Sequence, residues 1–157
     1  MVMMVEPFDR AVRAVKTRNK KTRVILLSAR GKKFMQKDVN RLKKYNQIVL
    51  LCGRYEGVDE RVAKKIAHES LSIGDYVLTG GELGAMVIVD AISRHIPGVL
   101  GKEASLAQES HAKPGYLEYP QYSRPEDYKG WKVPKVLLSG NHADIEKWRK
   151  KTSKDRS

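Results

Sequence analysis

The sequence has a single cysteine, Cys52, among its 157 residues. One cysteine excludes an intramolecular disulfide and is typical of a reducing compartment. Because Cys52 ends the apolar run at residues 48–52, we interpret it as a core residue and not as a nucleophile. No apolar run approaches the roughly 20 residues that span a bilayer, and the N-terminus has no signal-peptide pattern. We therefore expect a cytoplasmic protein without a membrane partner.

Several ligand motifs are also missing. No loop carries the GxGxxG pattern of a dinucleotide site or the GxxxxGK(S/T) pattern of a P-loop. The histidines lack the spacing of a zinc site, and we interpret each as a surface or packing residue: His68, His95, His111 and His142. The residues themselves therefore predict no metal site, and they disfavour a metalloenzyme.

Acidic residues are few beside the basic ones. The chain has 18 Asp and Glu against 31 Lys and Arg, a formal net charge of +13. Such an excess predicts an anionic partner, most commonly nucleic acid, although a well-solvated basic surface is the alternative. A hydrophobic fraction of 41% and this length fit one globular domain, or one domain with an appendage.

The first half of the chain alternates between two kinds of apolar pattern. Helical spacing of apolar residues predicts helices around residues 9–17, 39–45 and 58–66. Short apolar runs at residues 24–27 and 48–52 predict strands between them. Strands that alternate with helices predict an α/β fold with a largely parallel sheet.

Residues 72–82 read SIGDYVLTGGE and place a β-like run, 76–79, between glycines. Glycines at such corners let the backbone approach a ligand closely, and a flat guest with polar edges, such as an adenine ring, would suit them. An ordinary tight turn is the alternative. Two further polar turns, 28–31 and 53–57, follow the predicted strands. Because ligands of parallel sheets bind beyond the carboxyl ends of the strands, we expect the ligand site at these three loops.

The segments after residue 82 differ from one another in composition and in apolar spacing. Residues 83–92 form a strongly apolar helix pattern, which we expect to be buried against the sheet and against a partner subunit; full burial within one chain is the alternative. Residues 102–134 carry prolines and aromatics without periodicity, and their Tyr, Arg and Lys content suits stacking on unpaired bases. Asn141 and Asp144 predict the N-cap of a last helix.

Five motifs in a fixed order resemble the TrmD family of bacterial tRNA (guanine-N1)-methyltransferases, which belong to the SPOUT class. They read LLCGRYEGVDERV (50–62), SIGDYVLTGGELGAM (72–86), ISRHIPGVLG (92–101), YPQYSRP (119–125) and VLLSGNHADIEKWR (136–149). The resemblance implies a SPOUT-type parallel sheet with a C-terminal deep trefoil knot, an exception to the rule that chains avoid knots. It also implies three parts: a methyltransferase domain at 1–101, an interdomain linker at 102–134, and the start of a helical tRNA-binding domain at 135–157.

The same resemblance implies the activity. Members transfer a methyl group from S-adenosylmethionine to N1 of the guanine at position 37 of tRNA, so tRNA is the expected partner and DNA is not. Their sites are shared between the subunits of a homodimer, which places residues 83–96 in or near the interface. Members are assisted by Mg²⁺, although no residue of this sequence identifies an ion site.

The resemblance also assigns site residues. The cofactor-binding positions are Ser28, Gly53, Ile73, Gly74, Asp75, Tyr76, Val77, Leu78, Gly80 and Gly81. Arg54 and Glu56 match residues that hold the target guanosine, and Arg94 matches an arginine that stabilises charge on the guanine. Neutral guanine has no available lone pair at N1, so a base must remove the N1 proton. The family's base is an aspartate in the linker, and the matching residue here is Glu109, whose extra methylene changes the geometry.

Family members continue beyond both ends of this sequence. We therefore expect this chain to lack a first strand and helix, to be less stable than a longer member because a sheet edge is unpaired, and to have reduced activity or none. Two other classes stay open. A basic RNA-binding module without chemistry would bind RNA in a salt-dependent way that is indifferent to S-adenosylmethionine. A SPOUT methyltransferase with another target would respond to a transcript in which adenosine replaces the target guanosine.

Overall fold

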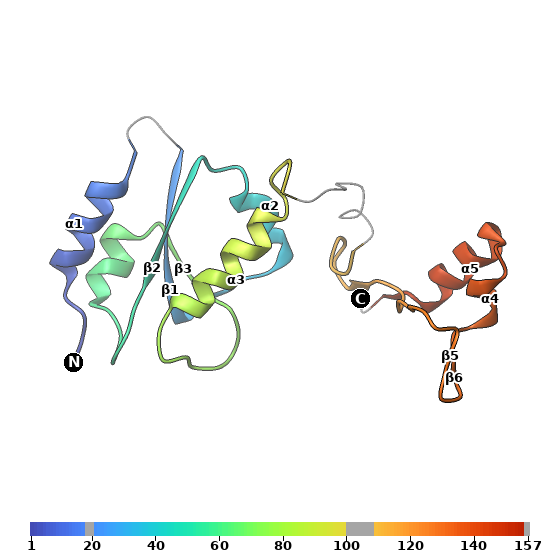
Figure 1. Ribbon diagram of the computed structural model, residues 1–157. Helices are drawn as coiled ribbons and strands as arrows, with labels where there is room; N and C mark the ends of the chain where they lie inside the picture. The colour runs from blue at the N-terminus through green and yellow to red at the C-terminus, as the bar shows by residue number, and fades with distance from the viewer. Residues whose placement is uncertain (18–20, 100–108, 156–157) are drawn as a thin grey trace. The chain divides into compact units, whose positions relative to one another are not determined.

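The computed structural model describes residues 1–17, 21–99 and 109–155. The chain divides into two compact units, Met1–Gly101 and Lys102–Ser157, and each is described by itself (Figure 1). The first unit is a mixed α/β structure, as predicted. Within the described ranges, no helix is both long enough and apolar enough to span a bilayer.

A parallel sheet of three strands forms the centre of the first unit. Its strands are β1 (Thr22–Lys33), β2 (Gln47–Cys52) and β3 (Glu69–Ser72), in the order β2-β1-β3. β1 pairs with both neighbours, so that Ile25 lies opposite Leu50 on one side and Glu69 on the other. The predicted parallel sheet is confirmed, and the two predicted strands are β1 and β2.

Helices cover both faces of this sheet (Figure 1). They are α1 (Val5–Val15), α2 (Gln36–Leu42), a single π-helical turn η1 (Val62–Ile66) and α3 (Glu82–Ser93). In β1, Val24 and Leu26 pack with α1 and η1, whereas Ile25 and Leu27 pack with α2 and α3. Side chains of a strand alternate between faces, so the unbroken apolar run of β1 follows from its burial on both sides.

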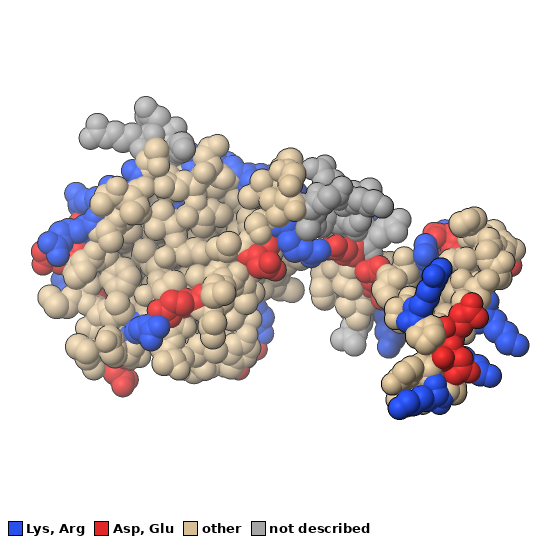
Figure 2. Space-filling model, in the orientation of Figure 1, with Lys and Arg blue, Asp and Glu red and all other residues tan. Residues whose placement is uncertain are grey.

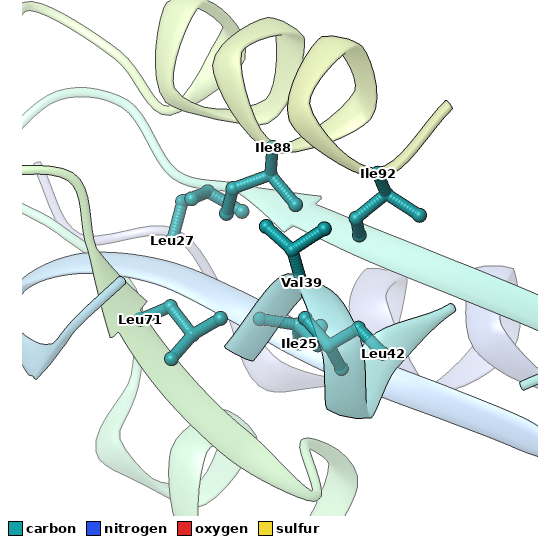
Figure 3. Close-up of a cluster of buried hydrophobic side chains, with 7 residues drawn as sticks. All are labelled: Ile25, Leu27, Val39, Leu42, Leu71, Ile88 and Ile92. Carbon is teal, nitrogen blue, oxygen red and sulfur yellow. The ribbon is translucent and has the colours of Figure 1, made fainter. Parts of the chain in front are cut away.

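The core between the sheet, α2 and α3 is a single cluster of buried aliphatic side chains (Figure 3). Its members are Ile25, Leu27, Val39, Leu42, Leu71, Ile88 and Ile92. Truncating one such buried Leu or Ile to Ala typically costs about 2–5 kcal/mol. This cluster therefore fixes α3, and with it the loop before α3, against the strands.

Three predicted elements were placed wrongly. Residues 76–79 form a loop and not a strand, and the strand lies earlier, at β3, where only Leu71 is apolar and fully buried. The helix expected around 9–17 begins earlier, at Val5, because Pro7 lies in the first turn, where its missing N–H has no intrahelical role. The helix expected around 58–66 shortens to η1, since Val58 instead forms a bridge with Met3.

The turn expected at residues 28–31 is part of β1 and not a separate loop. β1 shifts register there, and Leu27 and Lys32 both lie opposite Leu71. Gly31 lets β1 come back this close to β3, because a Cβ at position 31 would lie only 2.6 Å from the backbone nitrogen of Leu71. The extra residues bulge toward the carboxyl edge of the sheet.

The second unit is built on two helices, α4 (Lys135–Leu138) and α5 (His142–Thr152). Its short strands are β4 (Tyr116–Leu117), β5 (Asp127–Tyr128), β6 (Trp131–Lys132) and β7 (Lys154–Asp155). β4 pairs antiparallel with β7, and β5 pairs with β6. The predicted N-cap is confirmed, since the Asn141 side chain accepts hydrogen bonds from the backbone N–H groups of Ala143 and Asp144. Residues 102–108 of the expected linker lie outside the described residues.

Candidate functional site

The ends of the three strands surround a hollow of about 470 Å³. Three chain segments line most of it: residues 26–30 at the bulge of β1, residues 53–58 after β2, and residues 70–74 and 76–81 between β3 and α3. Parallel sheets typically bind ligands in this position, beyond the carboxyl ends of the strands. The three segments that the sequence singled out are therefore brought together at one edge of the sheet.

Backbone contacts hold two of these segments against each other. The Gly81 N–H donates to the Gly53 carbonyl at 3.0 Å, and Arg54 forms an antiparallel bridge with Gly80. A Cβ on Gly81 would lie 2.9 Å from the Cα of Cys52, closer than real Cβ contacts come. Only glycine fits there, so the backbone of this wall comes close to whatever occupies the hollow.

A charged pair joins the same two segments. Arg54 Nε donates to Glu82 Oε1 at 2.7 Å, and this contact raises the pKa of Arg54. The pKa of Glu82 is lowered, first by a hydrogen bond from its own backbone N–H and then by Arg54. Sequence reasoning assigned no role to Glu82, because nothing in the sequence links an acid to a base that lies 28 residues away.

The loop after β3 is a turn fixed by its own side chains. Ser72 Oγ accepts the Gly74 N–H at 3.2 Å and donates to the Gly74 carbonyl at 2.8 Å. Asp75 turns away and forms an ion pair with Lys33, at the end of β1. Tyr76 and Val77 stay 55% and 86% exposed, so their side chains are open to a ligand.

Most of the expected site residues line the hollow. They are Ser28, Gly53, Arg54, Glu56, Ile73, Gly74, Tyr76, Val77, Leu78, Gly80 and Gly81. Asp75, Arg94 and Glu109 are not among the lining residues. The position of Asp75 follows from its ion pair with Lys33, which sequence reasoning also missed.

Arg94 lies at the C-cap of α3, where its N–H donates to the Asp90 carbonyl at 3.3 Å. The next residue, His95, contacts α2: its Nε2 lies 2.9 Å from Gln36 Nε2. This hydrogen bond fixes the end of α3 against the start of α2. Arg94 therefore lies at a helix end that is held against α2.

Glu109 lies in the second unit, at the start of a compact turn. Its carbonyl accepts the Ala112 N–H at 3.1 Å, and Ser110 Oγ accepts the Glu118 N–H at 3.0 Å. The turn returns into β4, where the Tyr116 hydroxyl lies 3.2 Å from Ser153 Oγ, just after α5. Glu109 is thus held by the same unit that contains the last helix.

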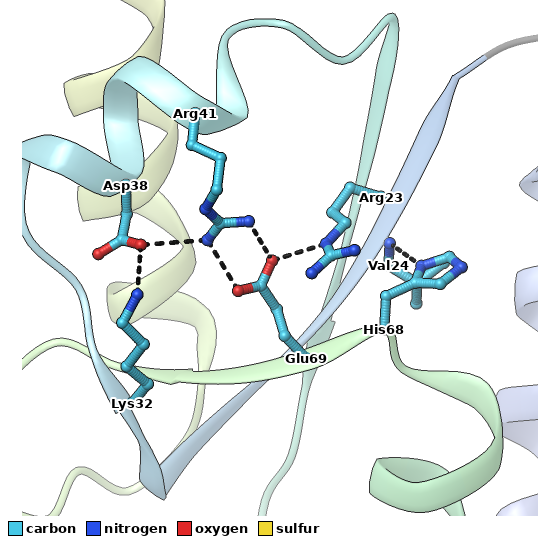
Figure 4. A network of polar contacts seen from close by, with 7 residues as sticks. All are labelled: Arg23, Val24, Lys32, Asp38, Arg41, His68 and Glu69. Carbon is cyan, nitrogen blue, oxygen red and sulfur yellow. Dashed lines mark hydrogen bonds and ion pairs between the residues drawn. The ribbon is translucent and has the colours of Figure 1, made fainter.

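A buried polar network supports the strand ends from the side of α2 (Figure 4). Asp38 is 1% exposed and accepts from Lys32 Nζ at 2.8 Å and from Arg41 at 3.1 Å. Arg41 also donates to both oxygens of Glu69 at 2.8 Å, and Arg23 donates to Glu69 at 2.7 Å. The network therefore connects both ends of β1 to α2 and β3.

The network sets the charge states of its acids. Burial alone would raise the pKa of Asp38, but hydrogen bonds from Lys32 and Arg41 hold it below its ordinary value. The same balance of burial against Arg41 and Arg23 lowers the pKa of Glu69. The hydrogen bond to Glu69 raises the pKa of Arg41. Asp38, Glu69 and Arg41 therefore stay charged at neutral pH.

The thiol of Cys52 and the grouping of possible metal ligands limit the chemistry that the described residues could perform. Burial raises the pKa of the Cys52 thiol, and the nearby Glu82 carboxylate raises it further, so Cys52 is not activated as a nucleophile. Among the described residues, no three His, Cys, Asp or Glu side chains are grouped so that they could hold a metal ion.

The outer face of α3 is apolar and exposed in this chain. Ile88 and Ile92 are buried against the sheet, whereas Leu83, Met86 and Val89 are 61%, 66% and 55% exposed. Uncharged side chains cover most of this face of the first unit (Figure 2). Full burial of the helix within one chain, the alternative drawn from the sequence, is therefore wrong.

A parallel α/β sheet whose strand ends surround a glycine-walled hollow is typical of proteins that bind a nucleotide-like cofactor. The family model described as tRNA (Guanine-1)-methyltransferase TrmD matches residues 1–157. The chain belongs to this family, and the resemblance of the five motifs is confirmed.

Curated relatives support the same family. A tRNA (guanine-N(1)-)-methyltransferase of Ruminiclostridium cellulolyticum is 54% identical over 158 residues, which cover 100% of this chain and 67% of the relative. Proteins with the same name from Dictyoglomus turgidum and Citrifermentans bemidjiense are 57% and 53% identical, over 96% of this chain and 60% of each relative. The chain thus spans about three fifths to two thirds of the length of these relatives.

Proposed function

We propose that this chain is the cofactor-binding and catalytic part of a tRNA (guanine37-N1)-methyltransferase. The observation that carries the proposal is the meeting of two family motif segments, 50–62 and 72–86, with the bulge of β1 around one hollow at the strand ends. About half of the residues are identical to those of relatives that are named for this activity. The family and the geometry therefore support the same chemistry.

S-adenosylmethionine is the proposed occupant of the hollow. A volume of about 470 Å³ is in the range of small-ligand sites, roughly 300–1,000 Å³. Gly53, Gly80 and Gly81 have no side chains, so the backbone of this wall can lie close to a flat adenine ring. Tyr76 and Val77 supply exposed side-chain surface at the rim. A trefoil knot through these segments belongs to the same proposal.

The reaction needs a positioned base, a positioned cation and a bound guanosine. Bound S-adenosylmethionine supplies an electrophilic methyl group on a sulfonium centre. Arg54 and Glu56 would hold the guanosine, and the Glu109 carboxylate would accept the N1 proton as N1 bonds to the methyl carbon. Arg94 would stabilise the negative charge that develops at O6. The electron pair of the broken C–S bond stays on sulfur.

A homodimer is the proposed assembly, with the exposed face of α3 at the interface. Leu83, Met86 and Val89 present a contiguous helical face of the kind that subunit interfaces cover. Met86→Glu places a charge on this face and should convert a dimer into a monomer in sedimentation. Arg10→Glu introduces the same side chain on the exposed side of α1, across the sheet from α3, and is the control. An unchanged sedimentation coefficient in Met86→Glu would contradict this interface.

Methyl transfer to a tRNA transcript tests the activity. We expect the chain to methylate a transcript with guanosine at position 37 and to leave the adenosine variant unmodified. RNA binding that is indifferent to S-adenosylmethionine, with no methyl transfer, would instead favour the basic binding module.

Chelation by EDTA tests the proposed Mg²⁺ assistance, and we expect lower turnover with an unchanged cofactor affinity. A cytoplasmic location fits a tRNA substrate and belongs to the same proposal.

A further inference from the structure

The hairpin β5–β6 in the second unit exposes two aromatic rings. Trp131 is 75% exposed and Tyr128 is 51% exposed. The two residues lie opposite each other across the hairpin, with ring centroids 5.8 Å apart and planes tilted by 59°. The hairpin extends away from α4 and α5 (Figure 1). Tryptophan is usually well buried, so an open tryptophan beside an open tyrosine calls for an explanation.

This hairpin is rigidly built. Its two-residue turn, Lys129 and Gly130, has φ values of 55° and 89°, the pattern of a type I′ turn. Asp127 Oδ1 accepts the Gly130 N–H at 2.7 Å, and the Val133 N–H donates to the Glu126 carbonyl at 2.9 Å. Lys129 therefore holds a left-handed conformation that few residues other than glycine adopt. A ring held in place before binding loses little entropy on binding.

Basic side chains accompany the rings. Lys129 Nζ lies 5.4 Å from the centroid of the Tyr128 ring. The Lys132 side chain is 73% exposed, and its Nζ lies 3.9 Å from Asp127, so its ammonium group stays accessible. Flat aromatic surface beside exposed cations fits a ligand with a planar face and a negative charge. An unpaired nucleotide has both, since its base stacks on the ring and its phosphate pairs with a lysine.

The size of the surface argues against a protein occupant. Two rings on a hairpin flanked by charged residues offer far less than the roughly 800 Å² per partner that a stable protein interface buries. A single stacked base needs no larger area. The net charge of +13 for the whole chain also favours a polyanion.

We propose that Tyr128 and Trp131 form a stacking platform for an unpaired nucleotide of the RNA substrate. The platform consists of residues distinct from those that line the hollow, and it rests on the proposal that tRNA is the substrate. Lys129 and Lys132 neutralise the phosphates on either side of the stacked base. The platform contributes to RNA affinity, so it lowers KM and leaves kcat unchanged.

Fluorescence anisotropy of a labelled, unmodified tRNA transcript with guanosine at position 37, titrated with the full chain, tests the platform. Base stacking contributes about 1–3 kcal/mol per base, so Trp131→Ala should weaken binding about 5- to 150-fold. Trp131→Phe keeps a ring and should retain most of the affinity. Lys132→Ala should reduce the slope of log K against log salt by about 1, a change that Trp131→Ala should not produce. Leu138→Ala, which removes a 46% exposed apolar side chain of α4, is the matched control.

A second measurement observes the wild-type chain directly and uses the conservative variant Trp131→Phe only to assign the signal. In the wild-type chain, tRNA should quench tryptophan fluorescence, and this component should vanish in Trp131→Phe, which keeps Trp148. Equal affinity of the wild type and Trp131→Ala, without such quenching, would overturn the platform and leave the methyltransferase proposal intact. A changed sedimentation coefficient in Trp131→Ala with unchanged RNA affinity would show that a second copy covers the ring, and would also overturn it. A wild-type chain that does not bind the transcript would overturn both proposals.

Discussion

Val24 and His68 hold each other by two hydrogen bonds. The Val24 N–H donates to His68 Nδ1 at 2.8 Å, and the His68 N–H donates to the Val24 carbonyl at 2.8 Å. The imidazole thus acts as an acceptor at the point where β1 and β3 begin to pair (Figure 4). This role requires the neutral ring with its proton on Nε2, because a protonated ring has no acceptor.

Folding stability should therefore depend on pH through His68. Burial lowers the pKa of His68 from its ordinary value of 6.5, and the charges of Arg23 and Lys16 lower it further, while Glu69 opposes them. A depressed pKa gives stability that is present above the unfolded value and is lost as the pH falls through the folded one. We expect the melting temperature to fall between about pH 7 and about pH 5, the range in which histidine titrates.

His68→Asn keeps an acceptor near the position of Nδ1 and cannot titrate. Thermal melts of this variant should show a flatter dependence on pH across the same range. The pKa values of Asp38 and Glu69 lie below 3.8 and 4.5, so their effect appears only at lower pH. If the variant and the wild type lost stability in parallel, another group would be responsible for the acid sensitivity.

Asp38 is the most buried member of the polar network, and its neutralisation should destabilise the chain. Asp38→Asn weakens two charged hydrogen bonds, from Lys32 and Arg41, each kind typically worth about 1.5–3 kcal/mol. Because both donors are partly exposed, we expect a total loss near the lower end of this range. Urea unfolding measures it. Asp9→Asn is the control, since its ion pair with Arg13 lies on the surface and should contribute less than about 1 kcal/mol.

Gly81→Ala should damage the site more than the fold. The new Cβ would lie 2.9 Å from Cys52 Cα and 3.1 Å from Leu27 Cβ, so the backbone between the two loops must move. A displacement near 1 Å can reduce catalysis about 100-fold, and we expect a loss of that order in methyl transfer. In Gly84→Ala, one turn later, the new Cβ would lie 3.3 Å from the flexible Leu27 Cδ1 and 3.7 Å from Ile73 Cγ2, with no backbone among its nearest atoms, so this variant should keep more activity. Equal activity of the two variants would contradict the close packing proposed at Gly81.

Glu109 is the proposed general base. Two variants separate the effect of its charge from the effect of its side-chain length. Glu109→Gln removes the carboxylate and should lower kcat about 10²- to 10⁴-fold, the usual contribution of general base catalysis. Glu109→Asp keeps the charge on a shorter side chain and should retain measurable turnover. Single-turnover methylation at saturating tRNA measures both. Full activity of Glu109→Gln would assign the proton transfer to another group.

The sequence predicted the central layers because their signals are local. The run from Val24 to Leu27 is apolar at every position, which is what burial on two faces requires, and α3 has a long apolar pattern. β3 gave almost no signal because Leu71 is its only aliphatic residue. Its place in the sheet depends on pairing with β1, which is a long-range interaction.

The candidate site could be predicted from the sequence where a glycine lets two backbone segments pack closely. Gly53, Gly80 and Gly81 all line the hollow, as expected from the turns that they form. The pairs Arg54–Glu82 and Lys33–Asp75 were not predictable, since each joins residues far apart in the chain. The second pair explains why Asp75, unlike its neighbours, does not line the hollow.

Calorimetric titration of the chain with S-adenosylmethionine tests whether the hollow is the cofactor site. We expect saturable binding at one site per chain, with affinity lowered in Tyr76→Ala, whose ring lines the hollow, and unchanged in Trp131→Ala. The absence of binding by a sample that melts cooperatively would contradict the assignment of the hollow as the cofactor site.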